Sequence, residues 1–456
     1  MIGLIGFGWF EGLKNKTTYD YFSGGRNVPW VVAMFSIVAT ETSVLTFISV
    51  PGIAYRSDWT FLQLGFGYIL GRILVSFVLL PKYFEDGITS IYEVIGQKFG
   101  LNIQKLASFI FLITRVLADG IRFLATAIIV QVITGWSLPN SVLIIGIVTL
   151  VYSLLGGIKT IVWIDSLQFL LYFFCGIITI IFILKNSNES LYQIYNSLFE
   201  LGKMKTFKFS GSPIFNPYYF FSAIIGGAFL SLSSHGVDYM MVQRVLITRG
   251  LKSGKKAMIG SGLFVVVQFF IFLIVGSLIY YFYDGIQIEK DREFSTFIVQ
   301  NLPSGLRGIL LAGILSAAMS TLSSSINSLA SSVVIDWFDN KVNLLKSRFI
   351  SFAWALILIL IALLFDQGDS AVIIIGLQIA SFTYGGLLGL FMLSKFDRQF
   401  NSFSIILGLI SSFFIVFYLK SLGIAWTWFI LVATTVNIFV VFCIEFVHFL
   451  IPVNKN

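Results

Sequence analysis

Long apolar segments, each followed by a short polar or Gly/Pro-bearing stretch, repeat along almost the whole chain. Crossing the hydrocarbon core of a bilayer takes about 20 apolar residues of α-helix. The pattern therefore predicts an all-α polytopic membrane protein, with twelve complete spans at about 30–55, 60–81, 106–133, 141–157, 164–184, 218–246, 257–283, 306–335, 349–365, 371–393, 404–419 and 426–450.

A further apolar segment at 1–10 is too short to cross alone, and it lacks the basic start of a cleaved signal peptide. We interpret it as the end of a span whose beginning is missing, which brings the expected total to about 13 transmembrane helices. No soluble domain or low-complexity tract interrupts the chain. We therefore expect a single transmembrane domain over 1–456, with its longest outward loops at 185–217 and 284–303.

The composition agrees with this pattern: 57% of residues are hydrophobic, 11% are charged and the mean hydropathy is +0.91. Lys and Arg are about twice as frequent in the loops of one side as in those of the other, which marks the first side as cytoplasmic. Arg244 and Arg249 are counted on that side, and Arg72, Arg115 and Arg122 lie within spans. The net charge of +8 thus reflects membrane orientation and indicates no nucleic-acid partner.

The chain offers few residues for metal or redox chemistry. Its two cysteines, Cys175 and Cys443, lie in separate spans, and His235 and His448 are its only histidines. It also has no GxSxG nucleophile motif and no cofactor motif. We therefore expect that the protein is not an enzyme.

Hydroxyl side chains follow one face of the span at 306–335. Five polar residues recur at intervals of three or four, and three more widen the face: Ser316, Ser320, Ser323, Asn327 and Ser331, with Thr321, Ser324 and Ser328. Small residues of this kind allow close helix packing. Aligned hydroxyls also supply the neutral oxygen ligands that a hard cation such as Na⁺ prefers.

A cation site needs ligands from more than one segment, and two further segments contain candidates. Residues 39–43 concentrate polar and β-branched groups in the middle of a span, ahead of Pro51 and Gly52. A helix broken there would free carbonyls to bind an ion; the alternative is an intact helix with a Pro kink. Asp165 lies just inside another span, where it either has a function or reaches the cytoplasmic surface and pairs with Lys159.

Arg115, Asp119 and Arg122 share one helix face at i, i+4 and i+7. Arg122 is our candidate anion clamp, because a guanidinium grips a carboxylate through two parallel hydrogen bonds. In the alternative, Asp119 neutralises one arginine and Glu41 another, which leaves no charge for a ligand. Arg72, Asp238, Gln243 and Arg244 are assigned to helix packing or to a cytoplasmic gate near the polar rim, and Tyr384 to the outer side of the site or to core packing.

Five motifs in order resemble the sodium:solute symporter family, which includes sodium-coupled proline, sugar, iodide and sialic acid transporters. They are YFSGGR at 21–26, the AxExS…PGxAY core at 39–55, LLGGIKTIVWIDSLQ at 154–168, SHGVDYMMVQR at 234–244 and LSAAMSTLSSSINS at 315–328. The segment at 46–61 looks most like the sialic acid branch. The resemblance implies a leucine-transporter-type fold with inverted repeats of five spans at about 28–184 and 218–393, and additional helices at about 401–451. It pairs the break near 39–43 with the Gly- and Ser-rich 226–236.

The resemblance also implies ligands. A main sodium site would use the carbonyls of Ala39, Thr42 and Ala317 with the hydroxyls of Ser320 and Thr321. A second sodium site, present in some members, would use Asp165, Ser320, Ser323 and Ser324. We expect the solute to contact Glu41, Ser43, Thr46, Arg122, Ser231, Ser234 and Gln378.

Several positions depart from the family pattern, so the solute does not follow from the resemblance. Glu41 stands where the sialic acid branch has a Thr, Gly65 where it has a Gln, and Ala118 where it has its carboxylate-binding Arg, with Arg122 one turn further on. Ser231 and Ser234 replace an Asn and the aromatic lid of the sugar branch.

These features together predict a sodium-coupled secondary active symporter that imports a small organic solute by alternating access. The solute would carry a carboxylate, as sialic acid or another acidic sugar does, and one or two sodium ions would accompany it. The alternatives are a symporter of neutral sugars, amino acids or vitamins, and a membrane sensor of solutes. We expect a functional monomer that crosses a bacterial inner membrane many times.

Overall fold

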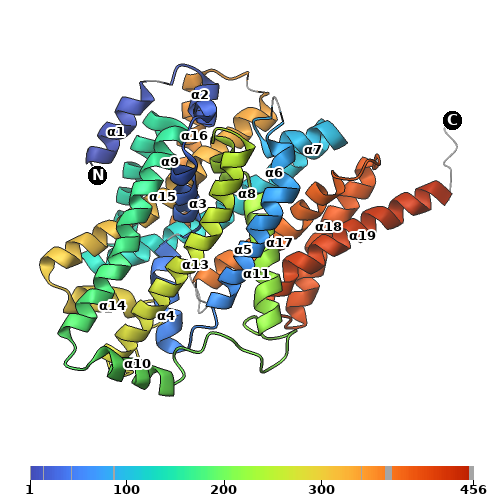
Figure 1. Cartoon of the computed structure of the whole chain (residues 1–456). Helices are drawn as coiled ribbons and strands as arrows, with labels where there is room; N and C mark the ends of the chain where they lie inside the picture. The colour runs from blue at the N-terminus through green and yellow to red at the C-terminus, as the bar shows by residue number, and fades with distance from the viewer. Residues whose placement is uncertain are drawn as a thin grey trace.

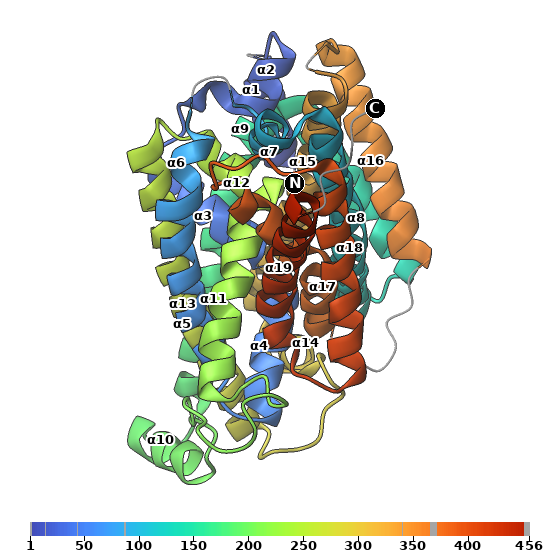
Figure 2. The same ribbon diagram turned by 90° about the vertical axis from the view of Figure 1, so that its right-hand side faces the viewer.

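The computed structural model describes residues 2–13, 15–42, 44–85, 88–339, 341–364 and 372–450. Within these ranges the chain is helical, and its one β feature is an isolated bridge between Val28 and Thr248. The long helices run roughly side by side as a bundle, with α2 and α7 at one end and α10 at the other (Figures 1 and 2). An all-α architecture was predicted and is confirmed.

The long elements of the bundle are α3 (Trp30–Glu41) with α4 (Val44–Arg56), α5 (Leu62–Leu74) continued by the π-helical turn η2 (Val75–Leu79) and α6 (Leu80–Tyr83), α8 (Leu101–Thr134), α9 (Leu138–Asn186), α11 (Phe220–Gly236) with α12 (Tyr239–Leu246), α13 (Leu251–Phe282), α15 (Ser304–Ser332) continued by the π-helical turn η3 (Val333–Trp337), α16 (Leu344–Leu364), α17 (Val372–Leu393), α18 (Ser402–Ser421) and α19 (Phe429–Leu450). Short helices lie between them: α1 (Ile2–Gly12), α2 (Thr18–Ser23), η1 (Gly24–Arg26), α7 (Ile91–Phe99), α10 (Leu191–Glu200), α14 (Glu293–Asn301) and η4 (Trp426–Trp428).

Each of the twelve predicted spans overlaps one of these long elements; Ser43, Phe365 and Ala371 within the predicted spans lie outside the described residues. By length and apolar composition, seven of the described helices are able to cross a membrane, or up to nine if each bent pair counts as one span. The two predicted spans 141–157 and 164–184 lie on the single element α9.

Helix α9 has 49 residues and would be about 73 Å long if it were straight, more than twice the thickness of a hydrocarbon core. Its backbone leaves the helical region at Gly157, with φ 67° and ψ −173°. Gly157 lies against Tyr21 of α2, and the end of α9 leads to α10 at the opposite end of the molecule (Figure 1). The element therefore makes two crossings that meet at a turn with almost no loop.

Helix α1 packs along α9 and has eleven residues, so it is about 16 Å long and too short to cross alone. The predicted outward loops 185–217 and 284–303 contain α10 and α14. Both helices lie toward the same end of the bundle, away from α2 and α7 (Figure 1). This arrangement agrees with the orientation derived from the Lys and Arg residues.

Two of the crossing elements are broken. Helix α3 ends at Glu41, Thr42 leaves the helical region with φ −89° and ψ 79°, and the chain bends by 60° before it continues as α4. Pro51 lies inside α4 and does not end it, so the alternative of an intact, Pro-kinked helix is wrong. The second break separates α11 from α12 with a bend of 64°, directly after the predicted segment 226–236.

Residue types at each break explain why the helices stop there. The Thr42 hydroxyl donates to the Val38 carbonyl, which also accepts from the Thr42 amide at 2.9 Å. The Asp238 carboxylate caps α12 by accepting from the Met240 amide at 2.9 Å. At the first break the Thr42 hydroxyl thus adds a second bond to the last turn of α3, and at the second break Asp238 replaces a missing backbone bond of α12.

Glycines let broken and intact helices approach closely. A Cβ atom placed on Gly276 of α13 would lie 2.0 Å from the Pro51 carbonyl oxygen of α4. The outer half of the first broken helix is thereby held against α13 by contact between the two backbones.

We predict that Gly276→Ala destabilises the protein by about 1–3 kcal/mol, because the added methyl group forces two backbones apart. Thermal unfolding in detergent measures this change. Gly308→Ala on α15 is the matched control, since no atom lies within 4 Å of its added Cβ. The control is expected to be neutral or slightly stabilising. Equal melting temperatures for Gly276→Ala and wild type would contradict the prediction.

Candidate ion and solute site

The hydroxyl face of α15 points into the protein. Ser316 is half-buried, and the other members of the predicted face are buried: Ser320, Thr321, Ser323, Ser324, Asn327, Ser328 and Ser331. Helix α15 packs mainly on α9 and also contacts α3, α4, α8 and α12. The face is therefore turned toward both breaks and away from lipid.

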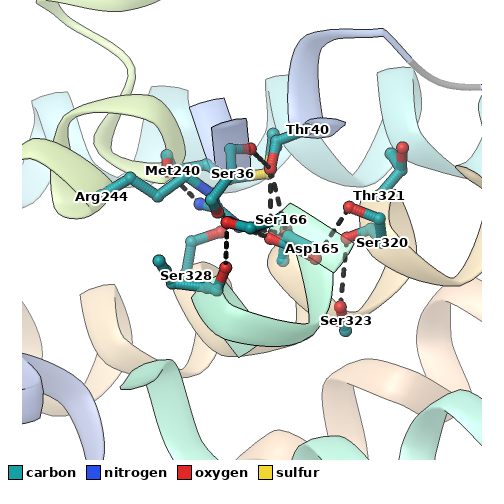
Figure 3. Close-up of polar contacts among 12 residues, drawn as sticks. Ser36, Thr40, Asp165, Ser166, Met240, Arg244, Ser320, Thr321, Ser323 and Ser328 are labelled. Carbon is teal, nitrogen blue, oxygen red and sulfur yellow. Dashed lines mark hydrogen bonds and ion pairs between the residues drawn. The ribbon is translucent and has the colours of Figure 1, made fainter. Parts of the chain in front are cut away.

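Asp165 of α9 lies at the centre of a cluster of hydroxyls (Figure 3). Its side chain is fully buried, Oδ1 accepts from the Ser320 hydroxyl at 2.7 Å, and Oδ2 accepts from Ser36 at 2.9 Å and Ser324 at 3.3 Å. The Thr40 hydroxyl lies 3.5 Å from Oδ2. Three helices, α3, α9 and α15, thus contribute oxygen atoms to one point.

Arg244 of α12 completes this cluster. Its Nη2 lies 3.3 Å from Asp165 Oδ2, its Nε donates to the Ser36 hydroxyl at 3.1 Å, and its guanidinium also contacts Ser324. Both side chains of the ion pair are 0% exposed, so neither reaches water. The ion pair joins the inner halves of both broken helices to α9.

One open alternative and one assignment are wrong at this point. Asp165 neither reaches the surface nor pairs with Lys159, which instead lies 3.8 Å from Glu11. Arg244 is a buried partner of Asp165, and Asp238 and Gln243 are also buried, so these three side chains do not lie at the polar rim. The buried carboxylate of Asp165 needs a counter-charge, and α12 supplies it from inside the protein.

The five residues expected for the main sodium site lie on helices that contact each other near the first break. Ala39 and Thr42 belong to the end of α3 and to the break, and Ala317, Ser320 and Thr321 lie on the α15 segment that faces it. All five are buried. The Thr321 hydroxyl is 3.4 Å from the Ala317 carbonyl, and the Thr42 hydroxyl contacts Tyr172 of α9.

The four residues expected for a second sodium site also lie close together, and each of them already has a partner within the protein. Ser320 and Ser324 donate to Asp165, and the Ser323 hydroxyl donates to the Ser320 carbonyl at 3.1 Å. The Arg244 guanidinium contacts both Asp165 and Ser324. A positive group of the protein thus lies where a second sodium ion would be bound.

A second buried charge network lies on α8. Arg115 forms ion pairs with Asp119 at 3.2 Å and with Asp238 at 2.5 Å, and the Tyr384 hydroxyl of α17 contacts both Arg115 and Asp238. Asp119 also accepts from Ser325 of α15 at 2.5 Å. The predicted common face of Arg115 and Asp119 is confirmed, and Tyr384 is a buried member of this network.

Arg122 differs from the other arginines in its partners. Its nearest carboxylate oxygen, Asp119 Oδ1, lies 3.6 Å from Nη1, beyond hydrogen-bond distance. Nη1 is buried and has no hydrogen-bond partner, while the side chain as a whole is 16% exposed. Arg122 therefore keeps a terminal Nη donor available, whereas both terminal nitrogens of Arg115 are held by Asp119, Asp238 and Tyr384 and only its Nε has no partner.

Glu41, the last residue of α3, forms an ion pair with the fully buried Arg72 of α5. Its Oε2 lies 3.6 Å from His235 Nε2, and the Ser234 hydroxyl lies 2.9 Å from His235 Nδ1. The open alternative of an internal network is thus correct in part, because Asp119 and Glu41 each neutralise an arginine. The partner of Glu41 is Arg72, an arginine we assigned to packing or gating.

Three other expected solute contacts, Thr46, Ser231 and Ser234, lie in different surroundings from Arg122 and Glu41. Thr46 is 5% exposed within α4, and the buried Ser231 donates to the Tyr68 carbonyl at 3.1 Å, which occupies its hydroxyl between α11 and α5. Ser234 is half-buried. Ser43 and the side chain of Gln378 lie outside the described residues.

The outer end of the first broken helix is joined to the short helix α14. Arg56 at the end of α4 forms ion pairs with Glu293, and with Asp291 at 3.3 Å. Burial raises the pKa of the Glu293 carboxyl, and the nearby Arg56 opposes that rise. This contact holds α14 over the outer side of the break.

A bundle in which two broken helices meet around oxygen-rich side chains defines a secondary transporter of the leucine-transporter type. The model of the sodium:solute symporter family matches residues 21–411, and the chain belongs to that family. It is therefore a multi-pass membrane protein and a sodium-coupled solute symporter, not an enzyme.

The chain is similar to named relatives over most of its length. It is 26% identical over 435 residues to the sodium/sialic acid symporter NanT of Aliivibrio fischeri, covering 92% of this chain and 85% of that protein. It is 28% identical over 426 residues to the sodium-coupled monocarboxylate transporter 1 of Mus musculus, covering 89% and 68%. A putative sodium-dependent multivitamin transporter of Drosophila melanogaster is 27% identical over 430 residues, covering 90% and 71%.

Solved structures share the fold. The chain resembles the substrate-bound, outward-open state of a Na⁺-coupled sialic acid symporter with a TM-score of 0.88 and 23% identity, covering 98% of this chain and 96% of that one. The closed conformation of Mhp1, a nucleobase-cation-symport-1 family transporter, gives a TM-score of 0.61 at 13% identity, covering 95% of each chain. The leucine-transporter-type fold expected from the sequence is confirmed.

Sequence reasoning missed several members of the two networks. Ser36 and Thr40 stand one turn apart on α3, a spacing that indicates a common polar face, and the structure places both beside Asp165. No local pattern shows that Arg244 reaches Asp165 across 79 residues of sequence, or that Asp238 meets Arg115. These pairs depend on the bend between α11 and α12.

We predict that Arg244→Gln destabilises the protein by about 3–5 kcal/mol, because it leaves a buried carboxylate without its counter-charge. The double variant Arg244→Gln/Asp165→Asn removes both charges and is expected to recover much of that loss. Thermal unfolding of Arg244→Gln, Asp165→Asn, the double variant and wild type measures the coupling. If the double variant unfolds as early as the sum of the single variants requires, the two charges are not paired in the folded protein.

Proposed function

We propose that this symporter imports a small organic solute with one carboxylate, such as sialic acid or another acidic sugar, and that Arg122 binds the carboxylate. The observation that carries the proposal is the buried Nη1 of Arg122, which has no hydrogen-bond partner. A guanidinium with a free donor fits an incoming carboxylate through two parallel hydrogen bonds. The relatives named for sialic acid and for monocarboxylates support the same class of solute.

The balance of buried charge also favours an anionic solute. Around the breaks, four arginines form ion pairs with four carboxylates: Arg72, Arg115, Arg122 and Arg244 with Glu41, Asp119, Asp165 and Asp238. These charges cancel before any ligand binds. A sodium ion alone would then add an uncompensated positive charge to a medium of low dielectric constant, whereas a sodium ion with a monocarboxylate keeps the sum at zero.

The main sodium ion is proposed to bind between the first break and α15, through the carbonyls of Ala39, Thr42 and Ala317 and the hydroxyls of Ser320 and Thr321. The end of α3 supports this site, since a helix C-terminus presents carbonyls without partners and carries partial negative charge. A second ion at Asp165, Ser320, Ser323 and Ser324 would first have to displace Arg244. We therefore propose one sodium ion while the Arg244 to Asp165 pair is closed.

Glu41, Ser43, Thr46 and Ser234 are proposed to line the solute site beside Arg122, with Gln378 on its outer side. Ser231 is left out because its hydroxyl is already bound to Tyr68. The five-span repeats at 28–184 and 218–393 would move against each other during transport, while the helices at 401–451 lie outside them. We propose that the protein acts as a monomer in a bacterial inner membrane.

A symporter of neutral sugars, amino acids or vitamins is the second candidate. It is favoured by the observation that Arg122 lies 3.6 Å from Asp119, because that carboxylate already compensates part of its charge. The putative multivitamin transporter among the relatives shows that the family is not confined to sialic acid and monocarboxylates.

We predict that Ser320→Ala or Thr321→Ala raises the sodium concentration for half-maximal uptake about tenfold, the effect of losing one contact to a charged group of about 1.5 kcal/mol. Uptake into proteoliposomes at a series of sodium concentrations measures the shift. Ser328→Ala on the same helix is the control, because its hydroxyl bonds only to the Ser325 carbonyl among the contacts described. Uptake that responds alike in all three variants would overturn the proposed sodium site.

We predict that sialic acid, other acidic sugars or monocarboxylates raise the melting temperature at fixed sodium, and that Arg122→Gln abolishes the gain. Neutral sugars and neutral amides of the same compounds serve as controls of matched size. Arg122→Lys keeps the charge without the two parallel donors and is expected to retain only part of the gain. Stabilisation confined to neutral compounds would remove Arg122 from this role.

A further inference from the structure

We propose that Asp119 and Ser325 are positioning residues that link the solute anchor, Arg122, to the sodium-binding segment of α15. This inference rests on the proposed function and names the contact through which solute and sodium would raise each other's affinity. The link runs from Arg122 to Asp119 on α8, then to Ser325, and then to the carbonyl of Thr321.

Ser325 is buried, and its hydroxyl has two acceptors but only one proton. Asp119 Oδ2 lies 2.5 Å from the Ser325 oxygen, and the Thr321 carbonyl oxygen lies 3.0 Å from it on the other side. A hydroxyl has one proton, so the two acceptors share it, and the shorter contact gives Asp119 the larger share. The Met240 sulfur of α12 lies 3.6 Å from Ser325 and 3.7 Å from Arg115, which closes the remaining side with a weak acceptor.

The strength of the hydrogen bond from Ser325 to Asp119 depends on how close Arg122 lies to Asp119. Without solute, Asp119 has Arg115 at 3.2 Å and Arg122 at 3.6 Å. A solute carboxylate that takes the free donor of Arg122 draws the guanidinium away, and Asp119 then binds the Ser325 hydroxyl more strongly. The anion at one end of the link therefore weakens the remaining bond from Ser325 to the Thr321 carbonyl at the other end.

The strength of the bond from Ser325 to Thr321 affects sodium binding because of where Thr321 lies. A Ser hydroxyl bonded to the carbonyl four residues earlier bends a helix locally. Here that carbonyl belongs to Thr321, one of the proposed sodium ligands, and Ser320 directly precedes it in the helix. A weaker bond from Ser325 to the Thr321 carbonyl straightens the turn that follows and turns the Ser320 and Thr321 hydroxyls toward the ion. Solute binding thereby raises sodium affinity, and by linkage sodium raises solute affinity to the same degree.

The test uses sodium as its only ligand. Sodium affinity is measured as the concentration that half-saturates the increase in melting temperature, with choline as the replacement cation. The variants are Arg122→Gln, Ser325→Ala and the double variant, in the full-length protein. Arg122→Gln imitates the departure of the guanidinium from Asp119, so we expect it to lower the half-saturating sodium concentration by about fivefold.

In the Ser325→Ala background the same change is expected to have less than about half of that effect, since the hydroxyl that carries the link is missing. Ser325→Thr retains a hydroxyl and is expected to restore it, and Ser328→Ala is the matched control that leaves the response to Arg122→Gln unchanged. Equal effects of Arg122→Gln with and without the Ser325 hydroxyl would show simple loss of positive charge and overturn the link. A wild-type protein whose melting temperature ignores sodium would instead remove the sodium site itself, and the link with it.

Discussion

An ionised group in the middle of a membrane protein must have a partner, and in this molecule the ion pair between Asp165 and Arg244 meets that constraint at the point where the moving helices converge. Its two members lie on α9 and α12, while Ser36 of α3 and Ser324 of α15 complete their hydrogen bonds. Removing either charge leaves the other unpaired in a medium of low dielectric constant. The pair therefore holds the inner halves of both broken helices in one arrangement, and any state in which the cytoplasmic side opens has to give both charges new partners.

A second anchor of the same kind acts on α12 from the opposite side. Asp238 caps that helix and binds Arg115 of α8 together with Tyr384 of α17, so one short helix carries an acid at its start and a base near its end. Asp238 is bound by α8 and α17, and Arg244 is bound by α3, α9 and α15. Arg122 lies at the edge of the second network and is 16% exposed, and the hydroxyl face of α15 lies between the two networks. The proposed solute and sodium sites would thus belong to one electrostatic arrangement.

Residues close in sequence explain what could be predicted. The spans follow from apolar segments of sufficient length, the α15 face follows from intervals of three and four, and the break beside Glu41 follows from polar and β-branched residues in mid-span. The partner of Asp165 could not be predicted. Lys159 is the nearest basic residue in the sequence, but the actual partner, Arg244, is 79 residues away and reaches Asp165 only because of the bend before α12. The same holds for Glu41 and Arg72, whose contact depends on how α5 packs beside the end of α3.

Gly157 has a consequence for how this protein enters its membrane. The two crossings of α9 share a single turn, formed by a residue with φ 67° and seated against Tyr21, where a side chain would collide with the Tyr21 carbonyl oxygen at 2.7 Å. No loop separates the two crossings, so their pairing depends on this one turn. A bulky residue here would strain the turn and press on Tyr21, and would thereby weaken the helical hairpin that has to form when the two crossings enter the bilayer.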